Sequence, residues 1–270
     1  MDITDNHFHL DPSGNKEHAV KEFLKAGGTR LVLVHKPYLP WKKVEDFKDQ
    51  VSVTLKLAEK ARMVGAKVAV VSSPHPIELL NLLEYNTPDK AQEIYLDAVD
   101  YCTNLVNEKE IVGLGELGRP HFEVDRDIWN LSNETLISSL SRAKDVDAAV
   151  VLHTESGTPE VMTDLSRIAN EARFPKSRLV KHYGSPAAVK ESSGLVVSLI
   201  SSMSNITSCS NFEFMLETDY LDDPKRPGAV MGPKTVPRKT RNALNQGILS
   251  ERKVHRIHTE LPDMVYRKFT

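Results

Sequence analysis

The stretch that decides the fold is Met1-Asp-Ile-Thr-Asp-Asn-His7-Phe8-His9-Leu10, which ends in a His-x-His pair. In an extended strand, residues two apart point to the same side and lie about 6.5–7 Å apart. Two imidazoles placed in this way can converge on one ion, because neutral imidazole is a common ligand of divalent transition metals. A half-buried strand with two hydrogen-bonded histidines would have the same pattern. The metal interpretation therefore requires further ligands from the rest of the chain.

Outward from this stretch, short apolar runs alternate with helical patterns along the chain. Thr87 can cap the clearest helix, and Pro88 suits its first position. Eight strands with helices between most of them predict an α/β fold of the (β/α)₈ TIM barrel type, although a doubly wound open sheet would alternate similarly. We predict strands at 1–10, 29–35, 67–71, 111–116, 148–153, 178–182, 195–199 and 212–219, and helices at 15–26, 41–64, from 87 onward, and at 130–144, 158–172 and 186–191.

Polar side chains at the ends of several predicted strands favour the barrel. An open sheet concentrates its site at one switch point, whereas a barrel gathers residues from the whole ring onto its C-terminal face. Each residue alone has an ordinary structural interpretation, but six of them buried in one layer would be costly unless paired or bound to cations. The six are His7, His9, Glu116, His153, His182 and Asp219.

Composition limits the other possibilities. The 270 residues fit one domain spanning 1–270, with 40% apolar residues, 27% charged residues and a net charge of −2. A protein that held a duplex over many phosphates would carry a basic excess, so any phosphate binding must be local. Cys102 and Cys209 lack a partner pattern, which suits a reducing compartment. The sequence has no signal-peptide pattern and no apolar run near the roughly 18 residues that span a bilayer, so we expect a cytoplasmic protein without membrane contact.

Five motifs, taken in order, resemble those of TatD-related metal-dependent hydrolases, the TatD-type deoxyribonuclease family of the amidohydrolase superfamily. Ser73-Pro-His75-Pro76 is also similar to the histidine-proline turn of this family, after the third strand. The resemblance covers almost the whole chain. The five motifs are Asp5-Asn-His7-Phe-His9-Leu10, Gly113-Leu-Gly-Glu116-Leu-Gly118, Leu152-His153-Thr-Glu155, Lys181-His182-Tyr-Gly184 and Leu216-Glu-Thr-Asp219.

The resemblance implies a metal-dependent hydrolase with two divalent cations, most simply a deoxyribonuclease acting on single-stranded DNA or another phosphodiester. Carried over by motif, one cation would be held by His7, His9 and Asp219, the other by His153 and His182, and Glu116 would bridge them. Carboxylate and imidazole ligands suit zinc, manganese or magnesium without choosing among them. Glu116 and Asp219 are the catalytic candidates, with Asp219 as general base.

Departures from the family pattern leave the substrate open. After Glu116, the family continues with an acidic and an aromatic residue, whereas this chain has Arg119-Pro120-His121. Arg119 would bind a phosphate or form a structural ion pair. His75 and Glu155 are further candidates for substrate contact, with a surface role as the alternative for Glu155. The stretch from Lys225 to Arg241 carries six basic residues, which would follow a phosphodiester backbone or form a solvated loop and helix.

Two other functions remain in view at this stage. The first keeps the metals and hydrolyses a small-molecule lactone, amide or phosphotriester. The second is a non-catalytic barrel that serves as a binding module, which the presence of all six ligand candidates disfavours.

Overall fold

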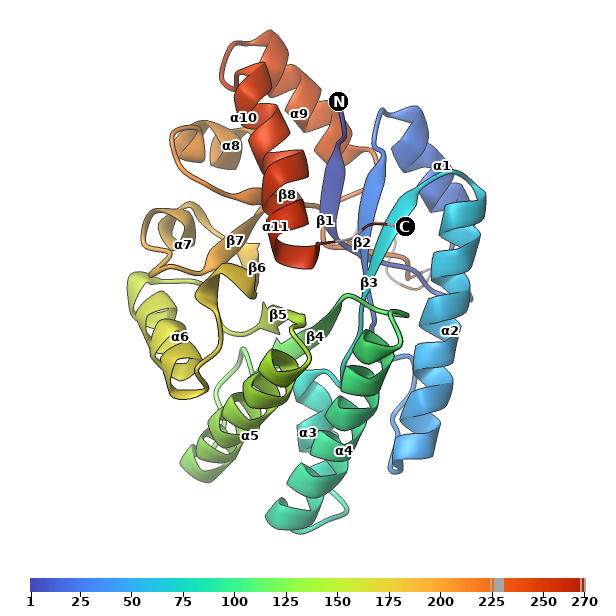
Figure 1. Cartoon of the computed structure of the whole chain (residues 1–270), viewed down its shortest axis with the longest axis vertical. Helices are drawn as coiled ribbons and strands as arrows, with labels where there is room; N and C mark the ends of the chain where they lie inside the picture. The colour runs from blue at the N-terminus through green and yellow to red at the C-terminus, as the bar shows by residue number, and fades with distance from the viewer. Residues whose placement is uncertain (224, 226–230, 268, 270) are drawn as a thin grey trace.

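The computed structural model describes residues 1–223, 225, 231–267 and 269. In these residues, nine parallel strands form a nearly closed barrel with helices between them (Figure 1). The strands follow each other around the barrel in the order β8-β7-β6-β5-β4-β3-β2-β1-β9. They are β1 Thr4–His9, β2 Arg30–Val34, β3 Lys67–Val71, β4 Gly113–Gly118, β5 Ala149–His153, β6 Leu179–Gly184, β7 Val196–Ile200, β8 Met215–Glu217 and β9 Tyr220–Leu221.

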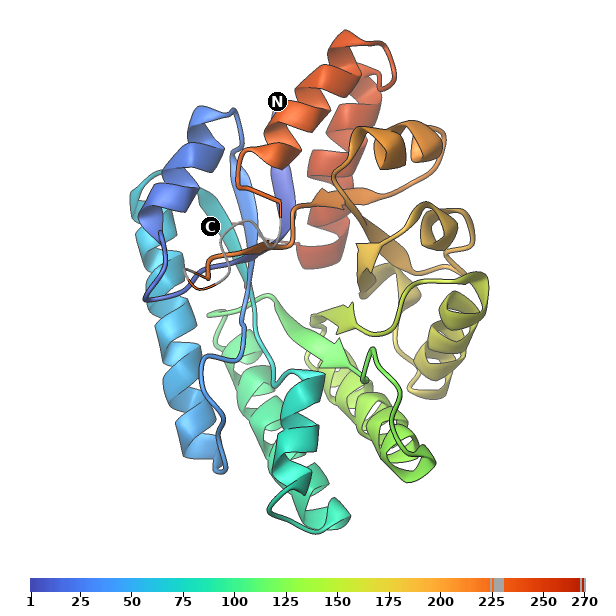
Figure 2. The same cartoon turned by 180° about the vertical axis from the view of Figure 1, so that it is seen from behind.

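Helices surround the barrel and connect successive strands, as Figure 2 shows from the opposite side. The described helices are α1 Glu17–Lys25, α2 Val44–Met63, α3 Pro76–Leu83, α4 Pro88–Asn107, α5 Arg126–Asp145, α6 Pro159–Glu171, α7 Pro186–Lys190, α8 Met203–Cys209, α9 Thr235–Asn245, α10 Glu251–His255 and α11 Leu261–Tyr266, with a 3₁₀ turn at Lys176–Arg178 and a π-helical turn at Arg256–Glu260.

The predicted barrel is confirmed, but its last predicted strand is shorter than expected and a further short strand follows it. The run 212–219 contains only β8, which pairs with β7, and the chain then turns at Asp219 with a φ of 50°. The short β9 follows and pairs in parallel with β1, so that Tyr220 lies opposite Phe8. Asp tolerates this left-handed conformation better than most residues. The turn therefore brings Asp219 to the mouth of the barrel between the two strands that close it.

Helix boundaries differ from the sequence prediction in ways that have local causes. The predicted helix from 41 begins only at Val44, because Trp41 is buried and its Nε1 donates a hydrogen bond to Glu78. Helix α3 was not predicted, and it begins where the His75 side chain accepts a hydrogen bond from the Ile77 amide. Thr87 precedes α4 as expected but makes no side-chain capping bond.

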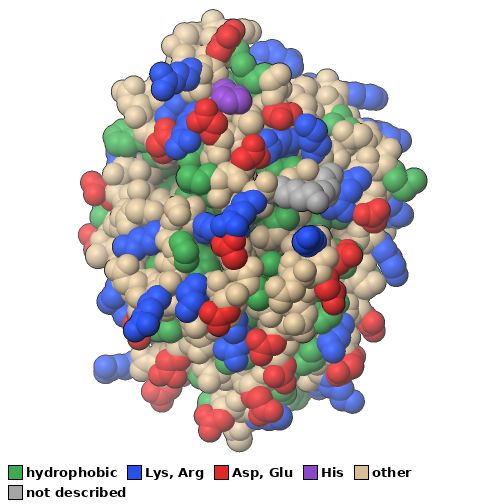
Figure 3. All heavy atoms as spheres, in the orientation of Figure 1, with side chains coloured by type: hydrophobic (Ala, Val, Ile, Leu, Met, Phe, Trp, Pro, Cys, Tyr) green, Lys and Arg blue, Asp and Glu red, His purple; other side chains and the backbone are tan. Residues whose placement is uncertain are grey.

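The core fills the layer between strands and helices. Residues such as Leu33, Val70, Leu114 and Val151 are almost completely buried. Burial of each such aliphatic side chain stabilises the folded state by about 1.5–3 kcal/mol relative to leaving it exposed. On the face drawn in Figure 3, positively and negatively charged side chains are interspersed. Within the described residues, no helix combines the length and the apolar character needed to cross a lipid bilayer.

Candidate metal centre

Strand β1 carries the first two predicted ligands into the barrel mouth. His7 is 0% exposed and His9 is 5% exposed, and their Nε2 atoms lie 3.1 Å apart. The Nδ1 atom of His9 lies 2.8 Å from the Val34 carbonyl oxygen, to which it can only donate. This hydrogen bond leaves the lone pair of neutral His9 on Nε2, facing His7.

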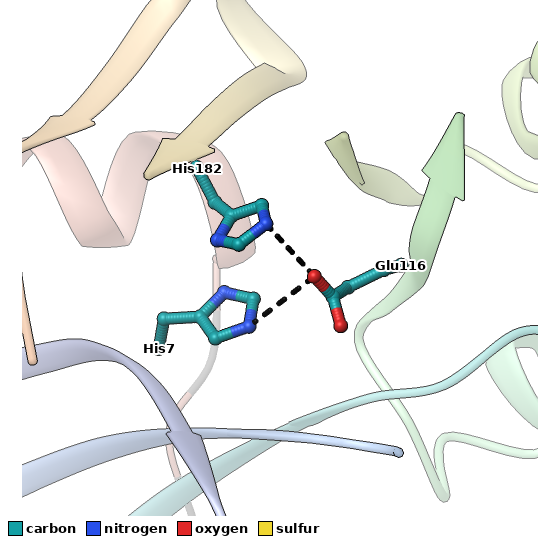
Figure 4. Close-up of side chains that lie close together, drawn as sticks. All are labelled: His7, Glu116 and His182. Atoms are coloured by element: carbon teal, nitrogen blue, oxygen red, sulfur yellow. Dashed lines mark ion pairs between the residues drawn. The ribbon is translucent and has the colours of Figure 1, made fainter. Parts of the chain in front are cut away.

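Glu116, on β4, lies at the centre of the cluster. Its Oε1 is 2.8 Å from His182 Nε2, 2.9 Å from His153 Nδ1 and 3.7 Å from His7 Nε2. Its Oε2 faces the other side, 3.8 Å from His9 Nε2. Figure 4 shows His7 and His182 pointing at this carboxylate from β1 and β6. One carboxylate oxygen is therefore available to each of two adjacent groups of histidines.

The ligand candidates of β5 and β6 lie beside each other and have outer partners. His153 Nδ1 is 3.1 Å from His182 Nε2, and both atoms face Glu116. Behind His182, Glu217 lies 3.5 Å from its Nδ1 and accepts a 2.6 Å hydrogen bond from the Tyr183 amide. On the outer side of His153, its Nε2 lies 2.9 Å from Nδ1 of the exposed His121. Such outer partners fix the orientation and tautomer of a ligand histidine.

Asp219 completes the group on the side of β1. Its Oδ1 lies 3.8 Å from His7 Nε2 and 3.6 Å from His9 Nε2, and its side chain is 20% exposed. It is more accessible to solvent than Glu116, whose side chain is 6% exposed. Asp219 thus has one face toward the histidines and the other toward the cavity.

His75 lies at the edge of the same cluster as a hydrogen-bond donor. Because its Nδ1 accepts a hydrogen bond from the Ile77 amide, the neutral ring must carry its proton on Nε2. That Nε2 lies 4.0 Å from Glu116 Oε2. Burial lowers the pKa of His75 to about 3. The ring is therefore neutral at physiological pH and presents an N–H group to the cavity.

Arg119 and Glu155 do not join the cluster, and the contacts of Arg119 are those of a structural ion pair, one of its two predicted roles. The Arg119 side chain is only 1% exposed. It forms a bidentate ion pair with Glu155, and its Nη1 lies 2.6 Å from Asp164 Oδ2. Its guanidinium carbon lies 4.4 Å from the centre of the Trp129 ring. Arg119 therefore links the loops after β4 and β5 to helices α5 and α6. The Glu155 carboxylate is engaged in this ion pair.

Burial and the charges within the cluster shift the pKa values of its carboxylate and imidazole groups. Burial acts to raise the pKa of Glu116, but interactions with the neighbouring His182, His153 and His7, His182 foremost, outweigh it and hold that pKa well below its usual range. Burial lowers the pKa of His7 strongly. For His182, burial is outweighed by the Glu116 and Glu217 carboxylates, which raise its pKa to about 10. Without an ion, a protonated His182 supplies the charge that Glu116 requires.

The donor atoms fit divalent cations. Three groups have donor atoms within 4.8 Å of one another, and Glu116 belongs to two of them. Together the groups hold five imidazoles and two carboxylates without thiolate, and the four imidazoles other than the N–H donor His75 suit zinc, manganese or magnesium as ligands. A protonated His182 beside Glu116 is an arrangement that a bound cation can replace. The three groups are His7–His9–Asp219, His7–Glu116–His182 and His75–Glu116–His153.

A cavity of about 700 Å³ opens over the cluster. Its wall includes residues that the sequence analysis did not select, among them Lys36, Tyr38 and Leu39 after β2. Their position directly after a predicted strand was the available signal, because the loops after the strands build the site in this fold. Lys36 lies 2.5 Å from Asp11. Lys225, from the predicted basic stretch, also lines the cavity, while Arg226 lies outside the described residues.

The family model described as "TatD related DNase" matches residues 4–267 of this chain. A curated relative, the uncharacterized protein MJ1127 of Methanocaldococcus jannaschii, is 35% identical over 271 residues, which cover 98% of this chain and 96% of the relative.

Solved structures give the same result for the fold. YjjV, a TatD homologue of Escherichia coli, superposes with a TM-score of 0.70 at 18% identity, covering 98% of each chain. The TatD-like protein of Archaeoglobus fulgidus gives 0.69 at 17% identity, covering 97% of this chain and 99% of its own. The phosphotriesterase homology protein of E. coli, solved with phosphate in its active site, gives 0.66 at 12% identity and 98% of each chain.

Proposed function

Because this chain belongs to the TatD-related DNase family of metal-dependent hydrolases, we propose that it is a phosphodiesterase that cleaves single-stranded DNA with two divalent cations. The observation that carries the proposal is the position of Glu116, which directs one carboxylate oxygen to His153 and His182 and the other to His9. Such a carboxylate is suited to bridge two cations. We propose the ligand sets His7, His9 and Asp219 for one cation and His153 and His182 for the other.

The cations, when bound, would polarise a phosphoryl oxygen and lower the pKa of water at the site. The protein side chains would accept the proton, bind the substrate and orient the ligands. Asp219 has its outer face toward the cavity and would accept the proton of the attacking water at its carboxylate. The Nε2–H group of His75 would donate a hydrogen bond to the phosphodiester. The Val34 carbonyl and the Glu217 carboxylate would fix the ring orientations of His9 and His182, respectively.

A second candidate is hydrolysis of a small phosphotriester, lactone or amide. Arg119 favours it, because its guanidinium is engaged by Glu155 and Asp164 and is not available to a phosphate. Phosphotriesterase-like proteins also share the fold.

A substrate profile separates the two candidates. The purified protein is incubated with single-stranded DNA, bis(p-nitrophenyl) phosphate, a phosphotriester and a set of lactones, with manganese or magnesium and with chelator. We expect metal-dependent cleavage of DNA and of the small phosphodiester. Turnover of a lactone or triester without cleavage of DNA would select the second candidate, and equal cleavage of DNA in chelator would contradict the proposed mechanism.

A further inference from the structure

Helices α1 and α9 lie next to each other around the barrel in both views (Figures 1 and 2). Lys234, directly before α9, lies 2.5 Å from Glu22 of α1, and Arg241 donates a hydrogen bond to the Ala26 carbonyl. A hollow of about 270 Å³ lies between them. It is lined by His18, Lys21, Glu22, Lys25, Ala26, Lys234 and Arg238.

This hollow, which we call the α1/α9 basic patch, brings four Lys or Arg side chains around one carboxylate. Lys21 and Lys25 are four residues apart, so they lie on the same side of α1, about 6 Å apart along its axis. The single carboxylate, Glu22, is already paired with Lys234. The patch is therefore strongly positive, although the whole chain carries a net charge of −2.

Some basic side chains on other helices have acidic partners. Arg167 pairs with both Asp164 and Glu171, and Arg256 pairs with Glu213 and Glu260. Within the described part of the chain, no ion pair joins Lys21, Lys25 or Arg238 to a carboxylate. Like charges four residues apart on a helix repel each other, so an external polyanion would stabilise this patch.

The patch is connected to the cavity by a fixed loop. Pro12 and Ser13 line the cavity and lie in the loop that leads to the start of α1 at Glu17. Asp222 anchors this loop, since its carboxylate accepts hydrogen bonds from the Asn15 amide at 2.7 Å and from the Lys16 amide at 2.8 Å. This loop therefore joins the wall of the cavity to the start of α1, the helix that carries Lys21 and Lys25.

We propose that the α1/α9 basic patch binds the phosphodiester backbone of a single nucleic-acid strand whose end occupies the cavity. This inference rests on the proposed function and adds a second binding surface for the polymer, outside the cavity. Lys21, Lys25 and Arg238 each neutralise a phosphate of the strand. The cavity of about 700 Å³ accommodates the end of one strand, whereas the patch supplies affinity without reading sequence.

The test compares two triple variants with the unmodified protein. The first is Lys21→Gln/Lys25→Gln/Arg238→Gln. The matched control, Lys176→Gln/Lys190→Gln/Arg252→Gln, removes the same charge elsewhere on the molecule. Binding of the metal-loaded proteins to a fluorescein-labelled phosphorothioate oligothymidylate of about 20 nucleotides is followed by fluorescence anisotropy as a function of salt.

Each lost phosphate contact lowers the slope of log K against log salt by about 0.7 for a single strand, so the patch variant should lose about 2. At 0.1 M salt, this corresponds to about a hundredfold weaker binding. The control should bind as the unmodified protein does. Equal affinity and slope in the patch variant, or no binding of the oligonucleotide by the unmodified protein, would overturn the proposal. Hydrolysis of bis(p-nitrophenyl) phosphate by the unmodified protein tests the proposed function separately, because that substrate is too short to reach the patch.

Discussion

Replacing Arg119 with Met tests whether this residue is structural. Its guanidinium contacts Glu155, Asp164 and Asn133 and lies over Trp129. Met retains much of the apolar stem but leaves two carboxylates and an amide without their shared donor. We therefore expect a large loss of stability and little direct effect on catalysis.

The size of the loss follows from the exposure of the partners. Removing one member of a fully buried ion pair costs about 3–5 kcal/mol. The Glu155 and Asp164 side chains are 24% and 35% exposed, so solvent reduces this to about 2 kcal/mol. The contact with Trp129 adds about 0.5–1 kcal/mol. The sum is a decrease of about 3 kcal/mol in the free energy of unfolding.

Urea denaturation followed by circular dichroism measures this change. With an m-value of about 3 kcal/mol per M, the midpoint should fall by about 1 M. Adding Glu155→Gln and Asp164→Asn to the Met variant should restore part of the loss, because the repulsion between the carboxylates is removed. A Met variant with unchanged stability and a tenfold higher KM for a phosphodiester would refute this reasoning. It would indicate that Arg119 contacts the substrate.

Three further predictions concern the cluster and its support. His121→Ala removes the outer partner of His153, and metal affinity measured by titration calorimetry should fall about tenfold, whereas replacement of the remote His255 should leave it unchanged. Gly118→Ala should cost more than about 2 kcal/mol in urea denaturation, because the new Cβ would lie 1.9 Å from the His153 carbonyl oxygen at a φ of 151°; a loss below about 0.5 kcal/mol would contradict the close packing. Burial lowers the pKa of His258 from 6.5 to about 4, so the unfolded state binds a proton first as the pH falls, and the contribution of His258 to stability should drop between pH 6.5 and 4 by about 1.4 kcal/mol per unit. His258→Gln should flatten this part of the stability profile, and an identical profile in the variant would show that another group is responsible.

The sequence predicted the barrel and the cluster because both depend on local patterns. Apolar runs mark strands, and the residue that ends such a run in a barrel lies on the C-terminal face. His153 and His182 could be selected for this reason, and the structure brings both within 3 Å of Glu116. The ordered motifs then indicated the family, which the family model confirms.

The features that sequence analysis missed depend on contacts between distant segments. Arg119 contacts Asp164, which is 45 positions away in the sequence, and no local sequence pattern predicts this pair. The strand predicted at 212–219 ends already at Glu217, where the Thr218 amide and hydroxyl donate hydrogen bonds to the distant Asp5. The α1/α9 basic patch combines residues more than 200 positions apart. Such contacts arise from packing around the whole barrel, which single-chain periodicity does not encode.

The most direct test of the central claim is the metal content of the purified protein and of Glu116→Gln, measured by elemental analysis beside cleavage of single-stranded DNA. Gln keeps the shape of the side chain but removes the charge shared by the two histidine groups, and circular dichroism verifies the fold. We expect about two metal ions per chain in the unmodified protein, with fewer ions and no cleavage in the variant. Full activity of the unmodified protein without any bound metal, or unchanged metal content and cleavage in Glu116→Gln, would contradict the account.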